Sequence, residues 1–263
     1  MIFKQLFEPD SCTFTYLLGC EDTGESVLID PVIDTVERDL EVIHSLGLKP
    51  SYTLETHIHA DHLTGARKMK ALASSQIVVP KMDQLACADL GIEEGKIFQV
   101  GNLQIQPLFT PGHTDTHHAY LIKSNAQTLL FTGDALLIEA CGRTDFQSGD
   151  PSELYNSIHQ KFFTLEDETL VYPGHDYEGR QVTSIGQEKQ RNPRVGNNKT
   201  EQEFVDIMNN MELPYPRKID FAVPGNTQCG QCPDNVPEEY RGPCDIQSVP
   251  IKARVEAKQG DQG

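Results

Sequence analysis

The segment Thr56-His57-Ile58-His59-Ala60-Asp61-His62 contains four potential metal ligands within six positions. Core packing does not account for such a density of imidazole and carboxylate groups. The segment follows a short apolar run, Tyr52 to Leu54, and precedes a helical stretch. We therefore expect a metal-binding loop directly after a strand.

Three further candidate ligands stand just past predicted strands: His113 after Leu103 to Phe109, Asp134 after Thr128 to Phe131, and His175 after Thr169 to Tyr172. If these strands run side by side in one direction, their loops emerge on one rim, where binding groups gather on a rigid scaffold. Imidazole nitrogens and carboxylate oxygens suit zinc, iron or manganese better than thiolate-preferring ions. The spacing thus predicts a metal site at this rim.

Short apolar runs that end in Gly, Pro or Asp recur as far as His175 and predict strands, which also cover Phe14 to Leu18, Ser26 to Ile29, Gln76 to Val79 and Ala119 to Ile122. Helical spacing predicts helices over 35–46, around 154–162, and over 179–190 and 200–211. Asp34 with Glu37 resembles a capping box for the first helix. Strands mixed with helices predict an α/β sandwich in which helices cover two packed sheets.

The formal net charge of -17 comes from 22 Lys and Arg residues against 39 Asp and Glu residues. This charge opposes binding to nucleic acid and to anionic membranes, so a small-molecule substrate is expected. The first residues resemble neither a secretory signal nor a transit peptide, and no apolar run is long enough to span a bilayer. Seven cysteines scattered over 263 residues do not indicate a disulfide framework, so a reducing, cytoplasmic location is expected.

The motif H-x-H-x-D-H, followed by His113, Asp134 and His175, resembles the metallo-β-lactamase superfamily over residues 1 to 215. Within that superfamily the chain resembles the persulfide dioxygenases, and this resemblance rests on Gly133 to Ile138, Cys141 to Gln147, His175-Asp176-Tyr177 and Asn192-Pro193-Arg194. The resemblance implies an αββα sandwich over residues 1–215. A partly irregular, Cys-containing extension then occupies residues 216–263.

The resemblance also implies a cofactor and a reaction. One Fe(2+) per chain is held by His57, His113 and Asp134, a 2-His-1-carboxylate facial triad that leaves positions open for substrate and dioxygen. The implied reaction oxidises glutathione persulfide with O2 to sulfite and glutathione. A homodimer is compatible with this interpretation.

Arg143, Tyr177 and Arg194 are the candidates for binding glutathione, because a planar guanidinium can hold a carboxylate through two hydrogen bonds and a tyrosine adds a hydroxyl. One of His117 and His118 is expected to support a metal ligand through its second ring nitrogen. The roles of Arg143, Tyr177 and Arg194 follow from the family resemblance, whereas that of His117 or His118 follows from their position at the start of a strand near the predicted ligands.

Counting ligands leaves an alternative open, since His59, Asp61, His62 and His175 would suffice for a second metal ion. Two Zn(2+) ions bridged by Asp134 would activate water, as in a glyoxalase II-like thiolester hydrolase. Against this alternative, the chain after residue 200 lacks the long basic helical region with which that family binds glutathione.

A third hypothesis is a non-catalytic sulfur carrier or redox-responsive binding protein, suggested by Cys229, Cys232 and Cys244 in the extension. Three cysteines do not complete a structural zinc site, which needs four ligands. A dithiol, a disulfide or a metal site completed elsewhere all stay open. Cys141 is expected to be a buried packing residue, because no His or Lys is placed to lower its pKa.

Overall fold

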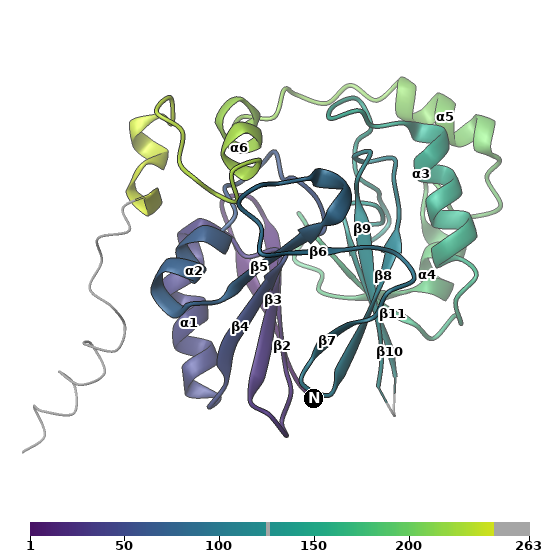
Figure 1. The fold of residues 1–263 in the computed structure, drawn as a ribbon. Coiled ribbons are helices and arrows are strands. Elements are labelled where there is room, and N and C mark those ends of the chain that lie inside the picture. The colour runs from purple at the N-terminus through teal and green to yellow at the C-terminus, as the bar shows by residue number, and fades with distance from the viewer. Residues whose placement is uncertain (125–126, 245–263) are drawn as a thin grey trace, which may run out of the picture.

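The computed structural model describes residues 1–124 and 127–244, and Figure 1 shows their arrangement as two sheets covered by helices on both outer sides. Within these residues the strand orders are β1-β2-β3-β4-β5-β6 in the first six-stranded sheet and β12-β11-β10-β9-β8-β7 in the second. The predicted αββα sandwich is therefore confirmed. The two sheets come from consecutive parts of the chain, which places the N-terminal and later ligands on opposite sheets.

The strands of the first sheet are Ile2–Glu8 (β1), Thr13–Gly19 (β2), Glu25–Ile29 (β3), Lys49–Leu54 (β4), Gln76–Pro80 (β5) and Leu90–Ile92 (β6). Those of the second sheet are Phe98–Val100 (β7), Leu103–Phe109 (β8), His118–Lys123 (β9), Thr128–Gly133 (β10), Leu170–Pro173 (β11) and Thr183–Ser184 (β12). The helices are Val36–Ser45 (α1), Ala66–Ala73 (α2), Pro151–Ser157 (α3), Ile185–Arg191 (α4), Glu201–Asn209 (α5) and Ile219–Asn226 (α6). A π-helical turn, Ile158–Phe162, extends α3, and short 3-10 turns cover Ile33–Thr35, Lys81–Asp83, Glu238–Tyr240 and Gly242–Cys244.

Three apolar layers hold the sandwich together. Between the sheets, aromatic side chains such as Tyr16 and Phe131 pack with aliphatic residues of both sheets. On the outside, α1 and α2 cover the first sheet, while α3 and α5 cover the second. Burying one large apolar side chain stabilises a fold by about 1.5–3 kcal/mol, so these layers make the sheets a rigid support for the loops at their rim.

The strands that precede the candidate ligands point in one direction within each sheet. In the first sheet β4 pairs in parallel with β3 and β5. In the second, β10 pairs in parallel with β11, and β8 runs the same way because both β8 and β10 are antiparallel to β9. The carboxyl ends of β8, β10 and β11 therefore meet at one rim, as the sequence predicted.

Some local predictions are wrong. Asp34 and Glu37 do not form a capping box, because α1 has Thr35 at its N-cap without a side-chain hydrogen bond. The predicted helix over 179–190 begins only at Ile185, since the preceding residues form the short edge strand β12. The strand β1 was not predicted from the sequence, because its partly exposed residues lack a clear alternation.

The extension is more ordered than its composition suggests. The helix α6 lies beside the N-terminal half of the fold (Figure 1). Of the two disulfides, Cys87–Cys229 links the segment after α6 to the first sheet's side of the fold, and Cys232–Cys244 closes a loop within the extension. The prediction that the cysteines form no disulfide framework is therefore wrong. The reason is that Cys87 and Cys229 are separated by 142 residues and meet only through the tertiary fold.

The domain boundary at 215 and the cytoplasmic location stay predictions, and the last dozen residues lie outside the described part of the chain.

Across residues 1–124 and 127–244, every helix is too short or too polar to traverse a lipid bilayer.

Candidate metal centre

His57 occupies the loop after β4, and its ring is held by a hydrogen-bond relay from Asp30. The Thr56 hydroxyl donates to Asp30 Oδ2 at 2.8 Å and therefore accepts from His57 Nδ1 at 2.9 Å. Asp30 also accepts from the Thr56 backbone N–H at 2.7 Å. With Nδ1 protonated, His57 Nε2 is left as the metal-binding atom. Burial and the neighbouring imidazoles hold the pKa of His57 well below its usual value, which favours the neutral form that ligates a metal.

His113 follows β8 and is oriented by a backbone carbonyl. The oxygen of Arg143 lies 2.7 Å from His113 Nδ1, and because a carbonyl only accepts, Nδ1 carries the proton and Nε2 is free. Gly142 makes this approach possible. A Cβ at Gly142 would lie 2.3 Å from the Asp134 carbonyl oxygen and 2.8 Å from His113 Nδ1.

Asp134 follows β10 and places its carboxylate near His57 and His113. Its Oδ2 lies 3.6 Å from His113 Nε2, and its buried Oδ1 has no hydrogen-bond partner among the described residues. The backbone N–H of Asp134 donates to His117 Nε2 at 3.3 Å, while His117 Nδ1 donates to the Thr110 hydroxyl. His117 thus supports the backbone of a candidate ligand, whereas His118 Nδ1 bonds to the Thr116 carbonyl and does not contribute.

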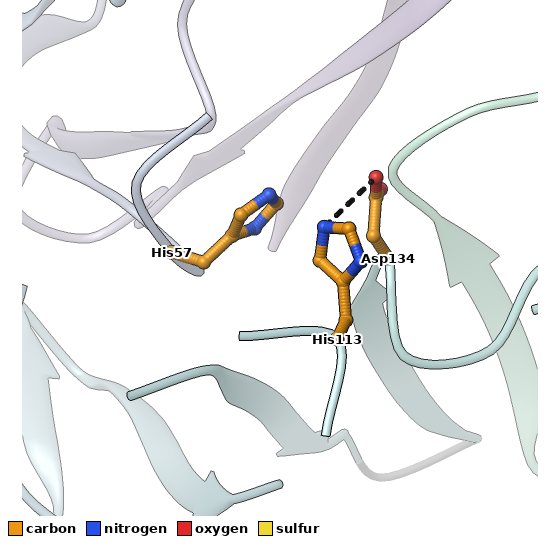
Figure 2. A group of neighbouring side chains, drawn as sticks. All are labelled: His57, His113 and Asp134. Atoms are coloured by element: carbon orange, nitrogen blue, oxygen red, sulfur yellow. Dashed lines mark ion pairs between the residues drawn. The ribbon is translucent and has the colours of Figure 1, made fainter. Parts of the chain in front are cut away.

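These three side chains converge on one point from both sheets, as Figure 2 shows. One ligand atom of each of His57, His113 and Asp134 lies within 4.8 Å of the others. Two imidazoles with free Nε2 atoms and an unpaired, buried carboxylate oxygen form a donor set that fits a divalent cation. The first predicted ligand set is therefore assembled by the fold.

His59 belongs to a second, overlapping group. Its Nε2 lies 3.1 Å from Asp30 Oδ1 and 3.4 Å from Glu55 Oε2, and its buried Nδ1 has no partner within the described chain. Although burial opposes the charge, the carboxylates of Asp30 and Glu55 raise the pKa of His59 well above its usual value. His59 thus braces the same Asp30 that orients His57.

The remaining candidate ligands Asp61, His62 and His175 form a connected group beside Asp134. Asp61 Oδ2 is 3.0 Å from His62 Nδ1 and 3.6 Å from His175 Nε2, and His175 Nε2 is 3.4 Å from Asp134 Oδ2. His175 Nδ1 donates to the Ser11 carbonyl, so its Nε2 faces the carboxylates. Burial opposes the charge of His175, but Asp134 and Asp61 raise its pKa. All seven predicted ligands therefore lie at one rim.

The predicted glutathione-binding residues have different surroundings. Arg143 forms a two-pronged pair with Asp145, at 2.6 and 2.7 Å, and also donates to the Pro214 carbonyl. Arg194 donates through Nη1 to the Cys141 carbonyl, and its Nε and Nη2 have no partner among the described residues. Tyr177 is 71% exposed and stacks on His175. Arg194 and Tyr177 can accept a ligand directly, whereas Arg143 must first release Asp145.

Sequence reasoning missed Thr56, Asp30 and Glu55. Asp30 directly follows β3, which is the same strand-end position that identified Asp134, so its position was a usable signal. Glu55 and Thr56 precede the first ligand, but the pairing of Thr56 with His57 and of Glu55 with His59 could not be inferred without the loop conformation. Cys141 is buried at 2% exposure, as predicted for a packing residue.

Comparisons with known proteins agree with this site. The family model described as the metallo-beta-lactamase superfamily matches residues 12–175. The mitochondrial persulfide dioxygenase ETHE1 of Homo sapiens is 46% identical over 231 residues, which cover 88% of this chain and 89% of that protein. The chain belongs to the persulfide dioxygenase family of this superfamily. The crystal structure of ETHE1 from Myxococcus xanthus, with 48% sequence identity, superposes with a TM-score of 0.83 over 88% of this chain and all of that one.

Membership of the persulfide dioxygenase family confirms the assignment made from the resemblance. A hydroxyacylglutathione hydrolase from Polaromonas sp. is also similar, at 34% identity over 167 residues that cover 62% of each chain. The shared part is smaller than for the dioxygenases. The comparison therefore places the hydrolases further from this chain, within the same fold.

Proposed function

We propose that the chain is a non-haem iron dioxygenase that oxidises glutathione persulfide with O2 to sulfite and glutathione. The observation that carries the proposal is the convergence of His57, His113 and Asp134 within 4.8 Å in a chain 46% identical to a persulfide dioxygenase. The proposed cofactor is one Fe(2+) per chain. His59, Asp61, His62 and His175 then support the site rather than complete it.

His57, His113 and Asp134 would hold an iron(II) ion, which would supply redox chemistry toward dioxygen and the substrate sulfur. The protein contributes orientation. Asp30, through Thr56, and the Arg143 carbonyl each fix one imidazole with its Nε2 directed at the site. Such partners of ligating histidines typically contribute about 10–100-fold in metal affinity or activity.

Glutathione persulfide is an anion that carries two further carboxylates, so it requires cations in an acidic protein. Arg194 offers Nε and Nη2 for a carboxylate, and the exposed Tyr177 hydroxyl lies beside His175. We propose that both contact the glutathione moiety. Arg143 joins them if the substrate carboxylate replaces Asp145 in its two-pronged pair.

The test combines metal analysis of anaerobically purified protein with oxygen uptake on addition of glutathione persulfide. We expect about one iron per chain, persulfide-dependent oxygen uptake and sulfite release, and we expect His113→Ala to abolish all three. The exposed His44, replaced in His44→Ala, is the matched control and leaves iron and turnover unchanged. Full iron content and normal turnover in His113→Ala would contradict the proposed triad.

The second candidate function is that of a dinuclear zinc thiolester hydrolase. It is favoured by the group His59, Asp61 and His62, whose ligand atoms also lie within 4.8 Å of one another, and by the nearby His175. Two zinc ions per chain, no oxygen uptake and hydrolysis of a glutathione thiolester would establish this function in place of the first.

The sulfur-carrier hypothesis has less support. Cys229 and Cys232 are both in disulfides, so neither offers a thiol to carry sulfur in this state. If Cys229→Ser with Cys232→Ser abolished sulfur handling while His113→Ala left it intact, the carrier hypothesis would replace the enzyme. The homodimer and the absence of nucleic-acid and membrane partners stay predictions.

A further inference from the structure

The end of α6 lies directly on the metal-binding loop that follows β4. Asn226, which is only 3% exposed, donates through Nδ2 to the carbonyl oxygens of His59 and His62, both at 2.8 Å. Its Oδ1 accepts from the Thr64 backbone N–H at 2.9 Å. One side chain therefore satisfies three backbone groups of the loop that contains four of the seven candidate ligands.

Together, these three hydrogen bonds require an amide side chain. The two carbonyl oxygens can only accept and the Thr64 N–H can only donate, so the partner must present two donors and one acceptor. Asparagine does so, whereas aspartate lacks the donors and alanine lacks all three groups. The three loop groups are buried with Asn226, and an unsatisfied buried polar group is unfavourable.

The backbone after α6 packs closely against the metal-binding loop and the start of α2. The Arg67 N–H donates to the Cys229 carbonyl at 3.1 Å. Gly230 has a φ of +87°, and a Cβ there would lie 2.1 Å from the Thr64 carbonyl oxygen. The close approach of segment 226–230 to the loop therefore depends on glycine at this position.

A covalent link and an apolar cluster hold Asn226 at this place. The disulfide Cys87–Cys229 ties the residue three positions after Asn226 to the segment between β5 and β6. Phe221 and Ala222 of α6 pack with Ile33 and Leu63, and Leu63 belongs to the metal-binding loop. A small cavity of about 10 Å³ is lined by both Asn226 and His57, so Asn226 lies close to the first candidate ligand.

We propose that Asn226 is a positioning residue for the metal centre, and that the Cys87–Cys229 disulfide keeps it in register with the loop. By fixing the carbonyls of His59 and His62, Asn226 sets the backbone path from His57 through Asp61 and His62. The extension is then part of the metal centre, although it contributes no ligand. This inference rests on the proposed function only in that it assumes a metal at the His57 site.

The test measures metal binding by the full chain, without substrate, so that it is independent of persulfide oxidation. Apo-protein is titrated with Co(2+), and both the affinity, by chelator competition, and the visible absorption spectrum, which reports ligand geometry, are recorded. We expect Asn226→Asp and Asn226→Ala to bind Co(2+) about 10-fold or more weakly and with an altered spectrum. Asn235→Ala is the control, because Asn235 is an exposed amide of the same extension whose side chain, within the described residues, bonds to the Asp220 carbonyl and not to the metal-binding loop.

A residue with a merely structural role would lower the unfolding temperature of the apo-protein without changing the cobalt spectrum. Folded Asn226→Asp with unchanged affinity and spectrum would therefore overturn the inference. Should the Asn226 variants not fold, Cys87→Ser decides, because it removes the Cys87–Cys229 disulfide and leaves the Asn226 side chain chemically unchanged. It must shift affinity and spectrum in the same direction, and unchanged values would overturn the inference.

Different results would refute the proposed dioxygenase function and the positioning role of Asn226. Unaltered protein that binds Co(2+) normally but does not oxidise persulfide would refute the proposed function and leave the role of Asn226 intact. Protein that oxidises persulfide equally well with Asn226 or Asp at this position, with an unchanged cobalt spectrum, would do the reverse.

Discussion

Replacing Thr56 by valine tests how the fold orients its first metal ligand. Valine has nearly the same shape but lacks Oγ1, which donates to Asp30 Oδ2 at 2.8 Å and accepts from His57 Nδ1 at 2.9 Å. The hydrogen bond from the Thr56 backbone N–H to Asp30 Oδ1 stays in place. The substitution therefore removes the relay between Asp30 and His57 and leaves the loop backbone attached.

The magnitude follows from the two polar atoms that lose their partner. Asp30 Oδ2 and His57 Nδ1 are both buried, and each unsatisfied buried group costs about 1–3 kcal/mol. We expect the free energy of unfolding of the apo-protein to fall by about 2–6 kcal/mol, since these two penalties apply together. The affinity for Fe(2+) or Co(2+) should fall by about 10–100-fold, because the His57 ring loses its orienting partner.

The assay is chelator competition for the metal, together with denaturant unfolding of the apo-protein. Thr53→Val is a matched control in β4, since Thr53 is equally buried but its Oγ1 has no hydrogen-bond partner among the described residues. It should leave metal affinity unchanged and the free energy of unfolding equal or higher. Equal metal affinity in Thr56→Val and Thr53→Val would refute the relay.

Three further predictions concern other parts of the fold. Burial raises the pKa of the Asp83 carboxyl from 3.8 to about 6. Between pH 3.8 and pH 6 the folded state therefore binds more protons than the unfolded state. The free energy of unfolding consequently rises as the pH falls through 6. At pH 7 the penalty is fully present, and we expect Asp83→Asn to stabilise the protein by up to about 3 kcal/mol in denaturant unfolding and to flatten this pH dependence. Burial likewise raises the pKa of Cys141 to about 11, so iodoacetamide at pH 8 should label this thiol, by mass spectrometry, only after denaturation; labelling of the native protein would contradict its packing role. Arg143→Ala should raise the KM for glutathione persulfide with a smaller effect on kcat, measured by oxygen uptake, and an unchanged KM would show that the Arg143 side chain does not bind the substrate.

Much of this molecule could be predicted from its residues because two local signals are strong. Alternating and continuous apolar runs identified the strands β2, β3, β4, β5, β8, β9, β10 and β11, and ligand-type residues directly after four of them identified the rim. The sequence patterns did not predict elements whose residues have only a weak local preference for helix or strand. The strand β1 and the extension around α6 are stabilised by contacts with distant segments, which no window of sequence contains.

The sequence alone predicted the candidate donor set and identified the family, since the order of His and Asp residues after successive strands is a property of the chain. Tertiary structure alone decided which nitrogen of each imidazole is free, because Asp30 acts on His57 through Thr56 and the Arg143 carbonyl acts on His113. It also decided that Asn226, from the far end of the chain, supports the metal-binding loop. The physical reason is that hydrogen bonds act over about 3 Å in space, and folding brings residues to that distance regardless of their separation in sequence.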